Sequence, residues 1–193
     1  DLELIADSFD YSGSHYEQAR LRCQNSEESF ITDLGINKFN KSSMVSLGLH
    51  AKANADRVEA SINWDNNKKT GSFRGQLNAH AIFEKQPGMP MDIGVLIHPS
   101  DVTVNDTTWN IRPAQIHIKG KEYAVNNLTI ENGDRRLRLH GAVSENPNDS
   151  LMAELKEINV DYVLRAVNFD AVSFSGYATG KAYASALLHE MTA

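Results

Sequence analysis

The sequence has few of the residues from which cross-linked, metal-binding or sugar-cleaving sites are built. Its 193 residues include a single cysteine, Cys23, so we expect no disulfide framework and no Cys-rich metal site. Aromatic residues make up 8% of the chain, and no aromatic platform for sugar stacking clusters beside the nearest carboxylate pairs, which disfavours a glycosidase. Those pairs, Glu27 with Glu28 and Asp101 with Asp106, fall in predicted turns, where acidic residues commonly favour the turn geometry.

Long hydrophobic runs are also missing. No apolar run approaches the roughly 20 residues that a membrane-spanning helix requires. No charged-then-apolar signal peptide precedes Asp1, and the strand pattern begins without an initiating Met. We therefore expect the chain to be a segment of a longer protein whose targeting information lies outside it.

Positive charge is sparse and dispersed. The net charge is -6 and the isoelectric point is near 5.6, and the only cluster of cations is formed by Arg135, Arg136 and Arg138. Nucleic-acid-binding surfaces gather Lys and Arg on one face, so we expect no nucleic-acid partner. The arginine cluster is interpreted as a solvated turn and strand face.

Catalytic motifs are not found either. The sequence contains no phosphate-binding loop, dinucleotide glycine pattern or nucleophile elbow. His50, His80, His117 and His140 fall on the polar positions of different predicted strands, and none belongs to a His-x-His pair. We interpret them as solvent-facing, and predict no metal site, no cofactor, no catalytic residue and no enzymatic activity.

What the sequence does contain is alternation of apolar and polar residues, most regular from Trp109 to Val143. The runs pause at Gly120–Glu122, at Asn126–Asn127 and at Asn132–Asp134, which we interpret as turns. A period of two puts one apolar row on one face of a sheet, so this region is predicted to form short, half-buried antiparallel strands. The Asn132–Gly133 pair is its strongest hairpin signal.

The same pattern extends toward the N-terminus. Strands are predicted over residues 44–53, 58–64 and 73–83, and the two prolines of Gln86–Pro90 predict a break after them. Residues 1–40 have looser spacing, which predicts short strands separated by turns at Gly13 and at Asn25–Ser29, with a brief helix over Tyr16–Arg22 as an alternative.

One helix is predicted near the C-terminus, over residues 159–167. Its apolar residues recur at helical spacing, at Val160, Val163, Leu164 and Val167, and Asn159 can cap its start. We expect it to lie against the apolar face of the sheet, after which residues 174–180 return to a period of two.

The predicted fold is mainly all-β: an elongated, curled, antiparallel or mixed sheet in which residues 1–193 form one segment of a longer array, with 1–90 and 91–193 as possible halves. Such a sheet must cover its apolar face, and two readings stay open, a dry sandwich or solenoid core and an apolar groove that accepts acyl chains. The candidate groove residues are Val45, Leu47, Leu49, Val58, Ile62, Trp64, Phe73, Leu77, Ile116, Ile118, Val125, Leu128, Ile130, Leu137, Leu139, Val143, Leu151, Leu155 and Phe174.

A family resemblance lies in the order of several strand segments. The segments Ile97–Val104, Trp109–Ile111, Val125–Ile130, Leu137–Ser144 and Leu151–Gly180 follow one another as they do in the TamB family, the inner-membrane component of the translocation and assembly module. The chain resembles the Bacteroidetes-type form of this AsmA-like family over about half of its length, and no single motif carries the resemblance.

The resemblance implies a non-catalytic protein of Gram-negative bacteria, anchored in the inner membrane through an N-terminal segment outside this chain and reaching across the periplasm. It implies a taco-like or U-shaped β-sheet trough lined with hydrophobic side chains. The implied functions are transport of phospholipid between the inner and outer membranes and assembly of outer-membrane proteins with an Omp85-type barrel partner. The family has no fixed site motif, so no functional residue is carried over from it.

Two other functions fit the same alternation. A structural or adhesive β-solenoid scaffold with a dry core would bind no lipid. A carbohydrate-active β-helix would place facing carboxylates and an aromatic-lined cleft on the polar side, which the few aromatic residues of this chain do not favour.

Overall fold

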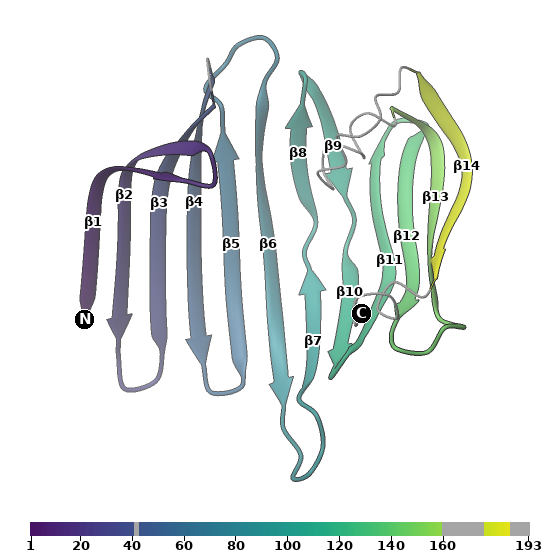
Figure 1. Ribbon diagram of the computed structural model, residues 1–193, viewed down its shortest axis with the longest axis horizontal. Coiled ribbons are helices and arrows are strands. Elements are labelled where there is room, and N and C mark those ends of the chain that lie inside the picture. Colours follow the sequence, from purple (N-terminus) through teal and green to yellow (C-terminus); the bar gives the residue numbers. More distant parts are fainter. Residues whose placement is uncertain (41–42, 160–175, 186–193) are drawn as a thin grey trace.

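The computed structural model describes residues 1–40, 43–159 and 176–185, and these residues form one antiparallel β-sheet (Figure 1). The all-β prediction is confirmed, and every strand pairing is antiparallel rather than mixed. The strands are β1 (Leu2–Tyr11), β2 (Ser14–Asn25), β3 (Phe30–Asn40), β4 (Ser43–Asn54), β5 (Arg57–Asp65), β6 (Phe73–Glu84), β7 (Asp92–Ile97), β8 (Ser100–Val104), β9 (Thr107–Ile111), β10 (Ala114–Lys119), β11 (Glu122–Asn132), β12 (Arg135–Val143), β13 (Ser150–Asn159) and β14 (Tyr177–Ser185).

The sheet is a meander in which two of the long strands are interrupted. Strands β1 to β7 follow one another in space, then β10 to β14 do the same. The β8–β9 hairpin fills the remaining space, because β8 pairs with β6 and β9 pairs with β11 (Figure 1). Strands β7 and β8 thus act as two pieces of one long strand beside β6. Strands β9 and β10 act as two pieces of one long strand beside β11.

Proline explains both interruptions. Pro99 separates β7 from β8, and Pro113 separates β9 from β10. Because proline has no N–H to donate to a ladder, a central strand must stop where it occurs. The predicted break at Gln86–Pro90 is confirmed by the same reasoning, since it lies in the connection between β6 and β7.

The predicted turn at Asn126–Asn127 is wrong, because these residues lie inside β11. They form a β-bulge: the β11–β12 register shifts between Val125 and Leu128, and Asn127 takes a positive φ of 58°. The extra residue keeps Val125 and Leu128 on the same face of the sheet. The hairpin signal at Asn132–Gly133 is confirmed, since β11 and β12 join through a tight turn in which Gly133 has a φ of +57°.

The N-terminal region is more regular than its sequence predicts. Strands β1, β2 and β3 are 10 to 12 residues long, not short. The alternative helix over Tyr16–Arg22 is wrong, because these residues belong to β2. The predicted turns near Gly13 and at Asn25–Ser29 are confirmed as the β1–β2 and β2–β3 connections. The helix expected over residues 159–167 lies outside the described residues, apart from Asn159, which ends β13.

A carboxylate ties the β8–β9 turn to the segment before β6. Asp106, at a φ of 63° in the turn, accepts hydrogen bonds from the Gly71 amide at 2.8 Å, the Ser72 amide at 3.0 Å and the Ser72 hydroxyl at 2.7 Å. These hydrogen bonds lower the pKa of the Asp106 carboxyl, with the Ser72 bonds contributing most.

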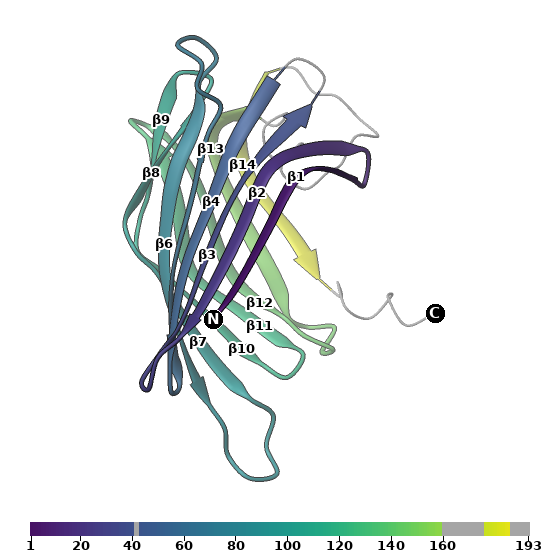
Figure 2. The ribbon, with the colours of Figure 1, turned by 90° about the vertical axis from the view of Figure 1, so that its left-hand side faces the viewer.

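The sheet is twisted and curled rather than flat (Figure 2). Within the described ranges it is a single layer, with no second sheet and no helix on either face. The buried hydrophobic residues of these ranges are accordingly few: Ile97, Trp109, Ala114 and Ile158. The part of the chain that the structure describes contains no helix of the length and apolarity needed to span a membrane.

Candidate functional site: the apolar face of the sheet

One face of the sheet carries an apolar row that crosses ten strands without a polar residue. Cross-strand partners in an antiparallel sheet point to the same side, so successive ladder pairs trace a line of side chains on one face. From β3 to β14 this line contains Phe30, Ala53, Val58, Ala81, Val95, Ile116, Val125, Gly141, Leu151 and Ala184. We call the face that bears this row the apolar face.

A second apolar row joins the first on the same face near β2 to β6. Its residues are Leu21, Leu34, Leu49, Ile62 and Leu77, paired in that order. On β11 to β13 the face continues through Leu128 opposite Leu139 and through Ile130 opposite Leu137 and Leu155. The face is therefore continuous from one side of the sheet to the other.

The strand register brings the predicted groove residues together. All of those that the structure describes lie on the apolar face, and Phe174 lies outside the described residues. The residues on this face are Val45, Leu47, Leu49, Val58, Ile62, Trp64, Phe73, Leu77, Ile116, Ile118, Val125, Leu128, Ile130, Leu137, Leu139, Val143, Leu151 and Leu155.

These side chains are not sealed from water. Ile62 is 46% exposed and Phe73 is 41% exposed, and the other described members are half-buried, so none is buried. A dry core would leave large aliphatic residues almost fully buried. The apolar face is thus open over most of its width.

On this face Ile97, Trp109 and Ala114 are buried, and close contacts also form around the start of β6. The Trp64 ring lies against Phe73, with ring centroids 5.9 Å apart, and it also covers Gly75. A Cβ atom at Gly75 would come within 2.6 Å of Trp64 Cζ2 and 2.9 Å of Val102 Cγ1, so only glycine fits beneath the indole.

The opposite face, which bears His50, Lys52 and Glu59, carries ion pairs across the strands. We call it the polar face. His50 Nδ1 lies 2.6 Å from Asp33, and Glu154 lies 3.0 Å from Lys181 on β14. The Lys181 ammonium lowers the pKa of Glu154, and the carboxylate in turn raises the pKa of Lys181. Pairs this exposed contribute little to stability, and their arrangement fits a wetted surface.

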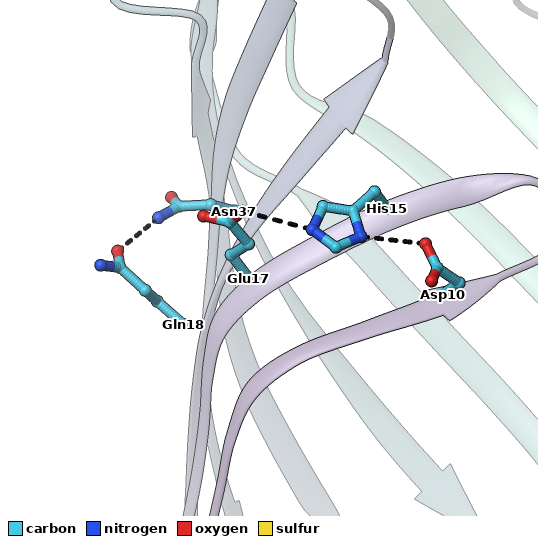
Figure 3. A network of polar contacts seen from close by, with 5 residues as sticks. All are labelled: Asp10, His15, Glu17, Gln18 and Asn37. Carbon is cyan, nitrogen blue, oxygen red and sulfur yellow. Dashed lines mark hydrogen bonds and ion pairs between the residues drawn. The ribbon is translucent and has the colours of Figure 1, made fainter.

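A further polar network lies on β1 and β2, where the His15 imidazole stands between two carboxylates (Figure 3). Nδ1 lies 2.9 Å from Asp10 and Nε2 lies 3.2 Å from Glu17. These bonds raise the pKa of His15, the bond to Asp10 most. Both ring nitrogens are thus engaged by carboxylates, one from β1 and one from β2.

Sequence reasoning missed one pair of histidines. His80 on β6 and His98, just after β7, meet on the polar face, with His80 Nδ1 3.0 Å from His98 Nε2. The two residues are 18 positions apart, and only the β6–β7 register brings them together. The remaining polar groups do not converge: the described residues hold no group of three or more His, Cys, Asp or Glu side chains placed to bind a metal ion.

Comparisons with known proteins assign no family to this chain. No protein-family model, no curated protein and no solved structure matches this chain.

Proposed function

We propose that the apolar face of this sheet binds the acyl chains of phospholipids and guides them along a periplasmic bridge between the inner and outer membranes. The observation that carries the proposal is the open apolar row from Phe30 to Ala184. Along each strand the residues of this face alternate with residues of the polar face. Monomeric soluble proteins rarely leave contiguous apolar patches of more than a few hundred Å² uncovered.

The apolar row is longer than one acyl chain, which favours movement of lipid along the row over binding at a single position. Ten strands about 4.8 Å apart extend the row over about 43 Å, whereas the acyl chains of one leaflet span about 15 Å, half of a hydrocarbon core of about 30 Å. An acyl chain lying across the strands would therefore have several equivalent positions. Because neighbouring positions offer similar aliphatic side chains, a chain could move between them without leaving an apolar surface.

The energetics are those of a surface, not of an enclosed pocket. Each methylene that leaves water contributes at most about 0.8 kcal/mol, and one face of the sheet covers only one side of an acyl chain. Binding per lipid is therefore modest, which suits transport, since a tightly held lipid would not move on. The charged headgroup would stay in water at the strand ends.

In this proposal the chain is a non-catalytic segment of a TamB-like, AsmA-like protein held at the inner membrane by a part of the protein outside this chain. The same bridge would serve assembly of outer-membrane proteins together with an Omp85-type barrel. The open apolar face supports this reading over an adhesive scaffold, because a scaffold has no need of an exposed aliphatic row.

The test is photocrosslinking in living bacteria that incorporate radiolabelled phosphate into their phospholipids. A photoreactive amino acid at Leu139 or Ala51 would point from the apolar face, and one at the adjacent Arg138 or Lys52 would point from the polar face. We expect radiolabelled adducts at Leu139 and Ala51 and none at the two control positions.

Two results would contradict the proposal. If the folded, abundant protein carries no lipid label at either apolar position, the face is covered by protein and the scaffold reading replaces the conduit. If the apolar and polar positions label equally, the label reports non-specific contact with membrane. A protein adduct at Leu139 and Ala51 in place of lipid would identify the covering partner.

A further inference from the structure

We propose that His80 and His98 form a two-histidine binding site for a divalent late first-row transition-metal ion such as Zn²⁺ or Cu²⁺. The site lies on the polar face, opposite the acyl-chain surface, so it is independent of the proposed transport function. Imidazole nitrogen is a preferred ligand for these ions.

The spacing of the two rings fits a shared ion. Zn²⁺ binds histidine nitrogens at about 2.0–2.1 Å, so two nitrogens on one tetrahedral ion lie about 3.3 Å apart. His80 Nδ1 and His98 Nε2 are 3.0 Å apart, and the ring centroids are 5.0 Å apart. Both rings would have to turn so that their facing lone pairs converge on an ion beside the line between the two nitrogens.

The backbone holds both histidines in this position. His80 belongs to the regular β6–β7 ladder, opposite Leu96. The His98 amide donates to the Asn78 carbonyl at 2.8 Å, and the Ser100 hydroxyl donates to the His98 carbonyl at 3.0 Å. Pro99 then ends the strand. Hydrogen bonds thus hold His98 through both its amide and its carbonyl, and the pair is preorganised.

Charged groups on β5 flank the pair. Burial lowers the pKa of His80, and the nearby Arg57 guanidinium and His98 act in the same direction, whereas Glu59 opposes them. Glu59 lies opposite His80, but it is paired with Arg57 at 3.0 Å, which offsets its negative charge. The site therefore depends on the geometry of the two rings and not on a net negative charge.

Without metal, the two rings share one hydrogen bond, so one facing nitrogen carries a proton and the other accepts it. Metal binding requires the proton to move to the far nitrogen of the same ring, leaving two lone pairs facing the ion. No net proton is released from a neutral pair. With two protein ligands, water completes the coordination, and the ion exchanges readily.

The experiment is a titration of the full chain with ZnCl₂, followed by two-dimensional NMR of the ¹⁵N-labelled imidazole rings. We expect His80 Nδ1 and His98 Nε2 to shift first and together, with one ion bound per chain. Single variants His80→Gln and His98→Gln should each weaken Zn²⁺ binding at least tenfold by calorimetry. His50→Gln and His117→Gln are matched controls, since each removes a polar-face histidine beside a carboxylate, Asp33 or Asp92.

The site is wrong if the first ring nitrogens to shift belong to His15, His50 or His117, each of which stands beside a carboxylate. It is also wrong if His98→Gln binds Zn²⁺ as tightly as the unsubstituted chain. The ring signals of the unsubstituted protein decide the outcome by themselves if either variant fails to fold.

Discussion

The regular strands β3–β5 and the irregular strands β6–β13 build the same sheet in different ways. The β3–β4 and β4–β5 ladders run from end to end without a register shift, and no described residue in them is buried. Strands β6–β13 contain two interrupted strands and two bulges, and they hold all four buried hydrophobic residues of the described ranges. Regular pairing thus accompanies an open apolar face, and irregular pairing accompanies close packing.

This difference predicts where substitutions will be tolerated. In the regular strands, a Cβ atom at Gly35 would meet nothing within 4 Å, and one at Gly48 would meet only the movable Asn63 side chain. In the irregular strands, an added Cβ atom would meet backbone at Gly141 and packed side chains at Gly75, whereas at Gly94 it would enter open space. Substitutions at matched glycines in the two regions therefore measure the difference directly.

The largest effect is expected for Gly141→Ala on β12. A Cβ atom there would lie 2.2 Å from the Ser150 carbonyl oxygen, and the residue has a φ of +120°. Backbone on both strands would have to move, and we expect a loss of about 3 kcal/mol or more in the free energy of unfolding, measured by urea denaturation. Gly35→Ala on β3 is the control, since its Cβ meets nothing within 4 Å. Equal urea midpoints for the two variants would show that the two regions do not differ in packing.

A smaller loss is expected for Gly75→Ala, where a methyl group would meet the Trp64 ring and Val102. Side chains can shift more easily than backbone, so we expect about 1–3 kcal/mol by the same measurement. Gly94→Ala on β7 has open space around its Cβ and should change stability little. Quenching or shift of Trp fluorescence in Gly75→Ala alone would confirm that the indole is displaced.

The hydrogen bonds that Asp106 accepts predict a stability that depends on pH in the acid range. Because the folded pKa of this carboxyl is below the usual 3.8, its hydrogen bonds stabilise the fold above pH 3.8, and that contribution is lost as the pH falls through the lower folded pKa. Asp106→Asn should therefore lower the thermal midpoint at neutral pH, and the difference from the unsubstituted protein should vanish in acid.

Asp134→Asn is the control for Asp106→Asn, since Asp134 is an exposed turn carboxylate 3.7 Å from Lys156. We expect its thermal midpoint to follow that of the unsubstituted protein at every pH. A pH-independent difference for Asp106→Asn would instead mean that the substitution disturbs the turn and not the charge.

The smallest effect is expected at the outer strand β1. The carboxylates of Asp10 and Glu17 raise the folded pKa of His15 above 6.5, so this contact stabilises the β1–β2 pairing below pH 6.5 and is lost as the pH rises through the folded pKa. Hydrogen exchange of β1 amides should become faster as the pH rises above 6.5, after correction for intrinsic exchange. His15→Gln should remove this pH dependence, while amides of β4 serve as an internal reference.

Alternation of residues predicted most of the strands because one wetted face and one apolar face impose a period of two. Residues 44–83 and 116–143 are examples, and every described groove residue has the same orientation in the sheet. The Asn126–Asn127 bulge was misjudged because Asn adopts a positive φ in turns and bulges alike, and only the β12 register distinguishes them. The same limit applies to His80 and His98, whose meeting depends on pairing between distant segments.

The prolines affect the strand order of the sheet as well as the local backbone. Pro99 ends β7 and Pro113 ends β9 at neighbouring places in the sheet. As a result, β7 with β8 and β9 with β10 stand where two long strands would otherwise run. Sequence analysis could place each strand piece but could not show that β8 pairs back to β6 while β7 pairs with β10, since a ladder partner is a long-range property.

The meander order has a consequence for how the molecule folds and changes in length. Apart from the β6–β11 region, each strand pairs only with the strands before and after it in the sequence. Loop closure between such neighbours costs little entropy, so folding can begin at any hairpin and spread outward, as in repeat proteins. Adding or deleting a hairpin would lengthen or shorten the apolar row by two positions without changing the pairing of the rest.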